Sequence, residues 1–195
     1  MFSMEFLDKN TIKLDITETK LDKAVLSFIK ILKKHTKYVI VSGYVAILFG
    51  RSRGTEDVDV IIPEMEKLKF NLFFKELIES GYWFLNSDDP DELYGLIRSN
   101  NSIRAAKSKQ MNPNFELKFA KNEIDKDSLN NSLIIKLPSG ELKTSPLESQ
   151  IAYKLYVLTS DKDIEDANYL LEVFKNHLDK NKLEKYSSIF KRRFK

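Results

Sequence analysis

The chain has 195 residues, of which 42% are hydrophobic and 31% are charged, and it contains no cysteine. This composition is typical of a globular protein and excludes a disordered tail, a collagen-like repeat and a disulfide-rich scaffold. The lack of cysteine also excludes disulfides, a thiol nucleophile and a cysteine zinc site.

The formal net charge is +3, and basic residues gather near the C-terminal end. Residues 181–195 contain one acid, Glu184, and six basic residues: Lys182, Lys185, Lys191, Arg192, Arg193 and Lys195. This cluster fits either a polyanion such as RNA or a solubilising basic face on a surface helix. No apolar run is long enough for a signal peptide or a membrane span, so we expect a cytoplasmic protein.

Periodicity predicts alternating helices and strands up to about residue 144. A first helix is expected from about residue 21 to His35, followed by a strand at 37–41, a turn at Ser42-Gly43 and a buried helix at 44–49 that ends at Gly50. Further predicted elements are strands at 57–62, 82–85 and 115–119, a helix at 64–80, and a hairpin of 133–137 with 141–143. Residues 87–92 and 100–111 are predicted as loops or short helices.

From residue 145 the pattern is helical. Ser145-Pro146-Leu147-Glu148 predicts a capping box with proline at the first helical position. Two further helices are expected at 164–178 and 183–190. We therefore expect an α+β protein in two parts: residues 1–144, with a small mixed β-sheet flanked by helices, and a C-terminal helical bundle, residues 145–195.

Two aspartates occupy alternate positions of the predicted strand 57–62. Asp57 and Asp59 therefore project from the same face and can share a hard cation such as Mg²⁺. The opposite face carries Val58 and Val60, whose burial would hold both acids in place. A pair of this spacing also occurs by chance on surface strands, so its context decides its meaning.

The residues around this pair supply that context. Gly43, between a strand and a helix, lets the backbone approach a phosphate, and Ser42 adds a hydroxyl donor. Arg51 and Arg53 lie between this turn and the aspartates, where either could pair with phosphate oxygens or simply decorate a surface loop. Metals held by oxygen ligands, together with a phosphate-binding turn, are what phosphoryl-type transfer requires.

This segment resembles the signature of the nucleotidyltransferase superfamily related to DNA polymerase β. In that superfamily a glycine followed by Gly or Ser opens a helix, and a D-x-D pair follows; here the first pair has the order Ser42-Gly43. The superfamily also places a third acid on a later strand, and Glu116 in Phe115-Glu116-Leu117-Lys118-Phe119 is the matching residue. The resemblance thus implies Asp57, Asp59 and Glu116 as catalytic and metal-binding residues.

The resemblance covers roughly residues 38–175, and its helical part is similar to the abortive-infection toxin-like branch of the superfamily. There a helical lysine and a later acid-rich element line the cleft, which implies Lys154 with Lys162 at the nucleotide phosphates and Asp163 or Asp166 in polar contacts. On a helical wheel, Lys154 falls on the apolar stripe, where it either binds nucleotide or extends its ammonium to water. Asp163 falls at the edge of an apolar face, whereas Asp166 points away from it.

The sequence therefore predicts a nucleotidyltransferase that depends on Mg²⁺ or Mn²⁺ and moves a nucleoside monophosphate from an NTP to an acceptor hydroxyl, releasing pyrophosphate. The acceptor is left open between an RNA or tRNA end, a protein and a small molecule, and the resemblance implies a toxin with an antitoxin partner. Arg104, Lys107 and Lys109 are candidates for RNA backbone contacts. The alternatives are an inactive module of the same fold that binds a nucleotide or partner, and an RNA-binding protein without a nucleotide site.

Overall fold

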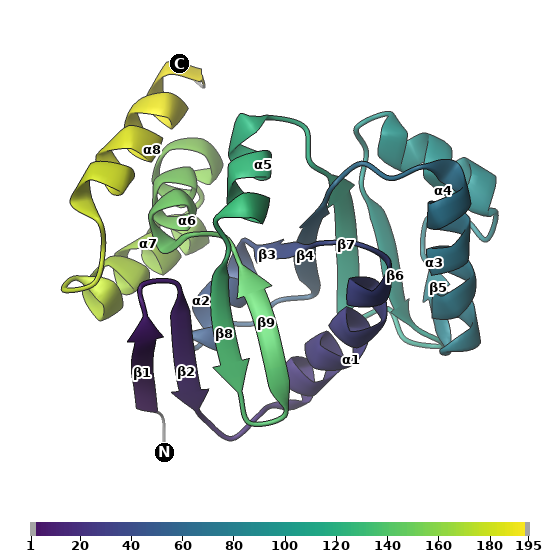
Figure 1. Ribbon diagram of the computed structural model, residues 1–195, viewed down its shortest axis with the longest axis horizontal. Helices are drawn as coiled ribbons and strands as arrows, with labels where there is room; N and C mark the ends of the chain where they lie inside the picture. Colours follow the sequence, from purple (N-terminus) through teal and green to yellow (C-terminus); the bar gives the residue numbers. More distant parts are fainter. Residues whose placement is uncertain (1–2, 194–195) are drawn as a thin grey trace.

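The computed structural model describes residues 3–193, which form a mixed sheet of nine strands with helices packed against it (Figure 1). The strands are β1 (Ser3–Asp8), β2 (Thr11–Asp15), β3 (Val39–Val41), β4 (Asp57–Ile62), β5 (Tyr82–Phe84), β6 (Ile103–Lys107), β7 (Asn114–Phe119), β8 (Leu133–Leu137) and β9 (Gly140–Thr144). The helices are α1 (Lys20–His35), α2 (Gly43–Leu48), α3 (Lys67–Glu79), α4 (Pro90–Arg98), α5 (Glu123–Asn130), α6 (Leu147–Tyr153), α7 (Asp161–Phe174) and α8 (Lys180–Arg193), and a π-helical turn, η1 (Lys154–Leu158), follows α6.

The strand order is β1-β2-β8-β9-β3-β4-β7-β6-β5. Strand β4 lies in the interior of the sheet, antiparallel to β3 and parallel to β7. The register of β4 and β7 places Asp59 directly opposite Glu116. Residues paired across neighbouring strands project from the same face, so this topology brings together acids that are far apart in the sequence.

The buried face of β4 anchors the strand. Val58, Val60 and Ile62 are fully buried, while the alternate residues of the strand stay partly exposed. On the same side, Phe28 of α1 stacks on Phe115 of β7 with ring centroids 4.0 Å apart. Each such apolar side chain contributes about 1.5–3 kcal/mol on burial, which fixes the direction in which Asp57 and Asp59 project.

Helix α1 begins with a reciprocal cap. The backbone N–H of Asp22 donates to Oγ1 of Thr19 at 3.1 Å, and the backbone N–H of Thr19 donates to Oδ2 of Asp22 at 2.8 Å. The buried hydroxyl of Tyr44 donates to Oδ1 of the same aspartate at 2.7 Å. This contact ties the first turn of α2, which follows Ser42-Gly43, to the start of α1.

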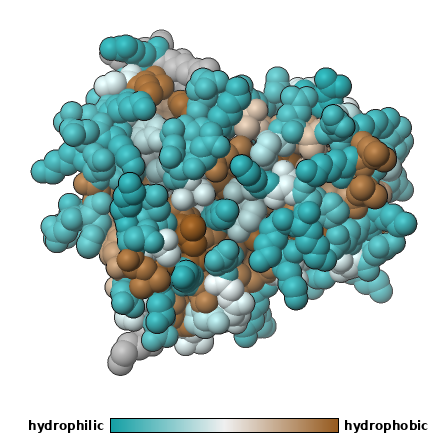
Figure 2. All heavy atoms as spheres, viewed as in Figure 1, coloured by the Kyte–Doolittle hydropathy of each residue, from teal (hydrophilic) through white to brown (hydrophobic). Residues whose placement is uncertain are grey.

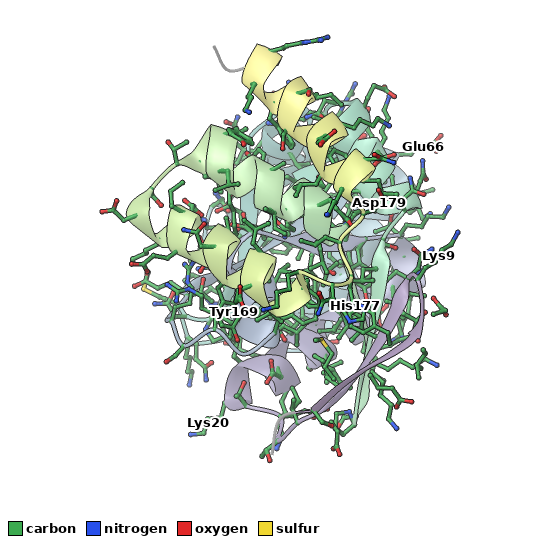
Figure 3. All side chains as sticks on the ribbon, turned by 90° about the vertical axis from the view of Figure 1, so that its left-hand side faces the viewer. Lys9, Lys20, Glu66, Tyr169, His177 and Asp179 are labelled. Atoms are coloured by element: carbon green, nitrogen blue, oxygen red, sulfur yellow. The ribbon has the colours of Figure 1, made fainter. Side chains whose placement is uncertain are left out.

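The C-terminal helices share the core of the sheet. Ile151 of α6 and Phe174 of α7 belong to the same buried apolar cluster as Val58 and Phe115. The rings of Phe49 and Phe174 meet edge to face at 4.7 Å, and the hydroxyl of Tyr169 donates to the carbonyl oxygen of Phe49 at 3.0 Å. Figure 3 labels Tyr169 among the side chains of the C-terminal helices. One apolar core therefore includes residues from both predicted parts of the chain, 1–144 and 145–195.

Most of the predicted elements are confirmed, including the first helix, the strand 57–62, the strand at 115–119 and the hairpin of β8 with β9. The sheet is larger than expected, because β1 and β2 form a hairpin that was not predicted, and β2 pairs with β8. The prediction of a loop or short helix over 100–111 was wrong for Ile103–Lys107, which forms β6. Pairing with β5 and β7 on both sides overrides the weak strand propensity of two adjacent alanines.

The predicted capping box at Ser145 was also wrong. Helix α6 begins at Leu147 after Pro146, and no side chain caps it. The hydroxyl of Ser145 is buried and has no hydrogen-bond partner among residues 3–193. Glu148 instead accepts a hydrogen bond from the backbone N–H of Asp179 at 2.8 Å, because the loop between α7 and α8 folds back onto the start of α6.

The basic C-terminal cluster lies on α8, except for Lys195, which is outside the described residues. Hydrophilic residues cover most of the face shown in Figure 2, and hydrophobic side chains gather there in small separate patches. Within residues 3–193, none of the helices combines the length and the apolar character needed to cross a lipid bilayer.

Candidate active site

Three carboxylates project from one face of two adjacent parallel strands. Asp57 and Asp59 come from β4, and Glu116 comes from β7 at the position opposite Asp59. The hydroxyl of Thr55 donates to the carbonyl oxygen of Asp57 at 2.8 Å and orders the entrance to β4. The structure thus places the three acids named from the sequence on one face of the sheet.

Two basic residues hold Glu116. Its Oε2 accepts hydrogen bonds from Nε and Nη2 of Arg104, at 2.8 and 2.6 Å, and its Oε1 lies 2.6 Å from Nζ of Lys118. Nζ of Lys118 also donates to Oδ1 of Asp59 at 3.2 Å. Although burial raises the pKa of Glu116, the hydrogen bonds from Lys118 and Arg104 outweigh it and hold the pKa below its usual value.

Asp59 has the opposite shift. Burial raises its pKa, the nearby Lys118 opposes that rise, and the negative charges of Glu116 and Asp57 add to it. Although burial lowers the pKa of Lys118, its contacts with Asp59 and Glu116 raise it overall, so Lys118 is charged. The site therefore concentrates negative charge that a cation stabilises, and Lys118 supplies one such cation.

Among residues 3–193, the His, Cys, Asp and Glu side chains form no group of three or more with the arrangement of a metal site. Glu116 is turned toward Arg104 and Lys118 and leaves Asp57 and Asp59 as a pair. Mg²⁺ is commonly held by one or two carboxylates together with substrate phosphates and water. The donor chemistry of the aspartate pair therefore fits Mg²⁺ that arrives with a nucleotide.

The predicted phosphate-binding turn lies beside the aspartates. Ser42 has a positive φ of 67° and Gly43 begins α2. A β-carbon on Gly43 would lie 3.1 Å from Nη2 of Arg53, so the guanidinium of Arg53 rests against this glycine. The backbone N–H of Ser42 donates to Oε1 of Gln150 at 3.3 Å, which links the turn to α6.

Asp166 gathers three of the four predicted phosphate-binding cations. Its Oδ1 accepts from Nε of Arg51 at 3.0 Å, and its Oδ2 accepts from Nζ of Lys154 at 2.8 Å and from Nη1 of Arg53. Asp166 and Lys154 are both fully buried. We call Asp166 with Arg51, Arg53 and Lys154 the Asp166 cluster; it joins the loop after α2 to η1 and α7.

The expectation that Asp166 points away from the core was wrong. The buried residues of α7 are Asp166, Ala167, Leu170 and Phe174, so the carboxylate of Asp166 lies on the inner face of the helix. Lys154 does not extend to water either, because its ammonium pairs with Asp166 and, at 3.0 Å, with Oδ1 of Asp163. Lys162 is exposed and lies outside this cluster.

Asp163 lies at the edge of the Asp166 cluster. Burial raises its pKa, but hydrogen bonds from Ser160 and Lys154 outweigh this and hold the pKa below its usual value. Burial raises the pKa of Tyr153, the charge of Lys118 lowers it, and the charges of Asp125, Asp59 and Asp163 add to the rise. The turn links the two sets of charges, because Val41, opposite Asp59, leads into Ser42-Gly43, and Arg53 of the Asp166 cluster rests against Gly43. The carboxylates of the sheet and the Asp166 cluster thus border one region.

The sequence pattern did not single out Lys118, Gln150 or Tyr153. Lys118 stands two residues after Glu116 on an alternating strand, and this spacing alone indicated that both share a face. The predicted RNA contacts at Arg104 and Lys107 have protein partners: Arg104 binds Glu116, and Lys107 donates to the carbonyl oxygen of Ser80 at 2.8 Å.

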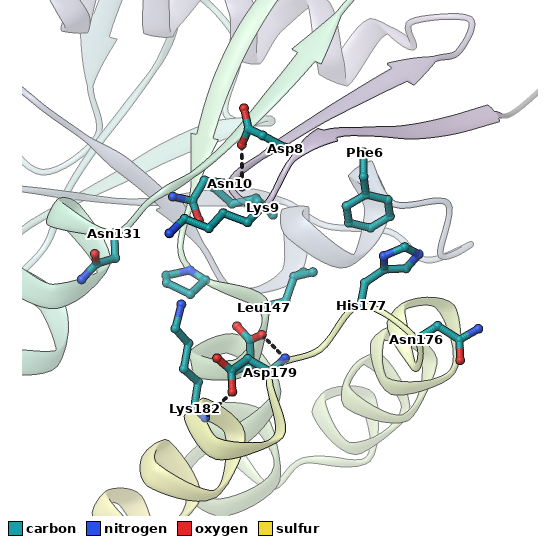
Figure 4. Close-up of a pocket in the computed structure, with 13 residues that line it drawn as sticks. Phe6, Asp8, Lys9, Asn10, Asn131, Leu147, Asn176, His177, Asp179 and Lys182 are labelled. Carbon is teal, nitrogen blue, oxygen red and sulfur yellow. Dashed lines mark hydrogen bonds between the residues drawn. The ribbon is translucent and has the colours of Figure 1, made fainter.

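A separate cavity of about 490 Å³ lies between the β1–β2 hairpin and the loop before α8 (Figure 4). None of the predicted site residues lines it. Asp8, Glu148 and Asp179, which do line it, each accept a backbone N–H and so stabilise turns and helix ends. His177 there stacks on Phe6 with ring centroids 3.7 Å apart.

No family model matches the sequence, and no curated protein matches it. Solved structures do match the fold. The solution structure of the antibiotic-resistance factor ANT(2″)-Ia aligns with a TM-score of 0.55 and 12% identity over 91% of this chain and 95% of that chain. The crystal structure of ANT(2″)-Ia in complex with adenylyl-2″-tobramycin gives 0.51 and 14%, over 90% and 97%.

A third match is an antigenic nucleotidyltransferase-like protein from Paracoccidioides brasiliensis, with a TM-score of 0.50 and 15% identity over 88% of this chain and 87% of that chain. At these identities the matches establish the fold alone. The chain has the nucleotidyltransferase fold, as its sequence predicted, and the matches do not address the toxin-like branch.

Proposed function

We propose that the protein is a metal-dependent nucleotidyltransferase that moves a nucleoside monophosphate from an NTP to an acceptor hydroxyl. The observation that carries this proposal is the placement of Asp57 and Asp59 on one face of β4, with Glu116 opposite Asp59. The fold supports it, and one structural neighbour is a complex with adenylyl-2″-tobramycin, a molecule in which an adenylyl group is joined to an acceptor.

Asp57 and Asp59 would hold Mg²⁺ or Mn²⁺. A bound divalent ion neutralises triphosphate charge and polarises the phosphoryl oxygens. Arg53, which rests on Gly43, and Arg51 would face the phosphates, and each guanidinium can bind two phosphate oxygens. Lys154, also predicted to bind the phosphates, is buried against Asp166 and would act by holding that carboxylate, which in turn holds both arginines. Ser42 would contribute its hydroxyl and Asp163 would hold Lys154 in place.

Glu116 would act on the acceptor. Its lowered pKa makes it a carboxylate at neutral pH, so it can accept the hydrogen of an acceptor hydroxyl beside Asp59. In the reaction, the hydroxyl oxygen bonds to the α-phosphorus, the bond from that phosphorus to the bridging oxygen of the β-phosphate breaks, and pyrophosphate leaves. The hydroxyl proton passes to Glu116 and then to solvent.

The acceptor classes are an RNA or tRNA end, a protein hydroxyl and a small molecule. A role as the toxin of a toxin–antitoxin pair, with an antitoxin protein as a partner, is part of the proposal through the resemblance stated above. The carboxylates of the site do not distinguish among these acceptors, nor do they indicate an antitoxin.

A second candidate is a nucleotide-binding module without turnover. One observation favours it: the ammonium of Lys118 already lies between Asp59 and Glu116, where it can replace a divalent cation. In that case a nucleotide would stabilise the protein without a requirement for Mg²⁺.

The two candidates are separated by thermal unfolding with each NTP, with and without Mg²⁺, and by an assay for pyrophosphate release. Binding to the folded state alone stabilises by about 2.7 kcal/mol at a hundredfold excess of ligand over Kd. We expect a Mg²⁺-dependent shift that is lost in Asp57→Asn/Asp59→Asn and kept in the control Asp88→Asn/Asp161→Asn, whose two acids are exposed. A shift without Mg²⁺ and without pyrophosphate release would favour the module.

A further inference from the structure

Both carboxylate oxygens of Glu116 are already bound by cations. Oε2 accepts hydrogen bonds from Nε and Nη2 of Arg104, and Oε1 lies 2.6 Å from Nζ of Lys118. The side chain of Glu116 is only 9% exposed, so it has little room to turn away from these partners. Its single negative charge faces two positive charges. Glu116 therefore attracts no divalent ion unless one of the two cations leaves.

The ammonium of Lys118 lies where a cation that bridges the two strands would lie. Strands β4 and β7 are neighbours in the sheet, with Asp59 opposite Glu116 and Ile61 opposite Lys118 (Figure 1). Nζ of Lys118 is 3.2 Å from Oδ1 of Asp59 and 2.6 Å from Oε1 of Glu116. In sites with two divalent ions, which lie about 3.5–4 Å apart, a metal ion joins carboxylates in this way. Here the side chain of Lys118 makes that connection.

The two aspartates keep other oxygens for a divalent ion. Oδ1 of Asp59 accepts from Lys118, and the hydroxyl of Thr55 lies 3.4 Å from Oδ1 of Asp57. Among residues 3–193, no group donates a hydrogen bond to Oδ2 of either aspartate. One or two carboxylates, with phosphates and water, are sufficient to hold Mg²⁺. The aspartate pair thus fits one ion, and Lys118 fills the place of a second.

Lys118 also has a hydrogen to spare. An ammonium carries three hydrogens, and the contacts with Asp59 and Glu116 use two of them. Within the part of the chain that the structure describes, Lys118 has no further partner, and its side chain is 38% exposed. The third hydrogen can therefore be donated to a ligand atom beside Glu116, which is the position proposed above for the acceptor hydroxyl.

We propose that Lys118 is a catalytic residue that takes the place of a second divalent ion, so that the protein works with one ion, held by Asp57 and Asp59. This proposal rests on the proposed nucleotidyl transfer and adds a residue and a metal count to it. Lys118 would donate a hydrogen bond to the acceptor oxygen as negative charge develops there, and a fixed donor at such an oxygen stabilises the transition state.

The bonds that change are those of the transfer described above. The acceptor oxygen bonds to the α-phosphorus, the bond from that phosphorus to the bridging oxygen of the β-phosphate breaks, and pyrophosphate leaves. The hydroxyl proton passes to Glu116. Lys118 keeps its own three protons throughout, so its part in the step is electrostatic.

Manganese counts the ions directly, because Mn²⁺ is paramagnetic and binds the same oxygen ligands as Mg²⁺. The experiment titrates the full-length protein with Mn²⁺ alone and measures free and bound ion by electron paramagnetic resonance. Ions bound elsewhere are those that remain in Asp57→Asn/Asp59→Asn, and they are subtracted. We expect one Mn²⁺ per chain in the wild type, with the spectrum of an isolated ion.

Lys118→Met should bind two ions, because it frees Oδ1 of Asp59 and Oε1 of Glu116. Two ions about 3.5–4 Å apart should give a spectrum broadened by spin coupling. Lys118→Arg keeps a cation and should keep the count of one, which guards against misfolding of the methionine variant. The matched control is Lys136→Met, at an exposed lysine of β8, which should bind one ion as the wild type does.

Pyrophosphate release gives a second measurement. Lys118→Met should lower kcat about 100- to 1,000-fold with little change in KM for the NTP, and high Mn²⁺ should restore part of the rate.

Two coupled ions in the wild type, or a single ion in Lys118→Met, overturns the role of Lys118 and leaves the proposed transfer intact. Failure of the proposed function gives a different result, because the wild type then binds no Mn²⁺ that depends on Asp57 and Asp59, and this overturns both.

Discussion

The guanidinium of Arg53 rests against the Cα of Gly43, so close that a β-carbon on the glycine would lie 3.1 Å from Nη2. The side chain is held there by Asp166, a fully buried carboxylate from a helix more than a hundred residues later. The turn that would receive phosphates and the cation that would bind them are thus in direct contact.

Gly43→Ala should displace Arg53 while the protein still folds. The added methyl meets the far end of a flexible side chain, which can move by a few tenths of an ångström. Since charge-assisted hydrogen bonds contribute about 1.5–3 kcal/mol each, we expect nucleotide affinity to fall about tenfold or more. Isothermal titration with an NTP and Mg²⁺ measures the loss; Gly95→Ala, at a glycine with open space around it, is the control.

Asp166→Ala should destabilise the protein by about 3–5 kcal/mol, because it leaves Lys154 buried without its closest partner and frees Arg51 and Arg53. Urea unfolding at neutral pH measures this change. Asp161→Ala, at an exposed position of the same helix, should change the free energy of unfolding by no more than about 0.5 kcal/mol. Equal effects of the two variants would contradict the role assigned to the Asp166 cluster.

Lys118→Met should enlarge the stabilisation that Mg²⁺ and a nucleotide confer. Removal of the ammonium leaves Asp57, Asp59 and Glu116 with Arg104 as their nearest counter-charge, so the variant is less stable without metal and gains more from it. Thermal unfolding across a Mg²⁺ series tests this, with Lys121→Met, at an exposed position in the loop after β7, as the control. An unchanged response to Mg²⁺ would mean that the aspartates do not bind the ion.

Asp163 should contribute stability that disappears in acid. Its pKa in the folded protein lies below the ordinary value of 3.8, so the unfolded chain takes up the proton first as the pH falls. The contribution is complete above pH 3.8 and is lost as the pH falls through the lower, folded value. The difference in unfolding free energy between wild type and Asp163→Asn, about 1–2 kcal/mol at pH 7, should therefore shrink by pH 3.

Local signals identified much of this site. The alternation of Asp57-Val58-Asp59-Val60 is sufficient to place both aspartates on one face, because the period of a strand is two residues. The same rule, with the resemblance, selected Glu116. Its position opposite Asp59, however, depends on the pairing of β4 with β7, which no local pattern encodes.

No local sequence pattern predicted the Asp166 cluster. Ala167 and Phe174 of the predicted apolar face of α7 are buried, but Ile164 and Leu171 are only partly buried and Leu170 is buried in addition, because α7 packs on both α2 and η1. A small rotation of the buried face moves Asp166 from solvent to the interior. Only the cations supplied by other elements make that burial favourable.

The order of the strands has a consequence for how the protein assembles during synthesis. Strand β2 near the N-terminus pairs with β8, and Asp166 near the other end holds Arg51 and Arg53. Neither contact can form until most of the chain has left the ribosome. Partners this distant in the sequence make folding slow, because long loops must close before any contact is gained. The loop that carries Arg51 and Arg53 is thus among the last parts to be fixed, so a chain that ends before Asp166 carries both arginines without the carboxylate that holds them.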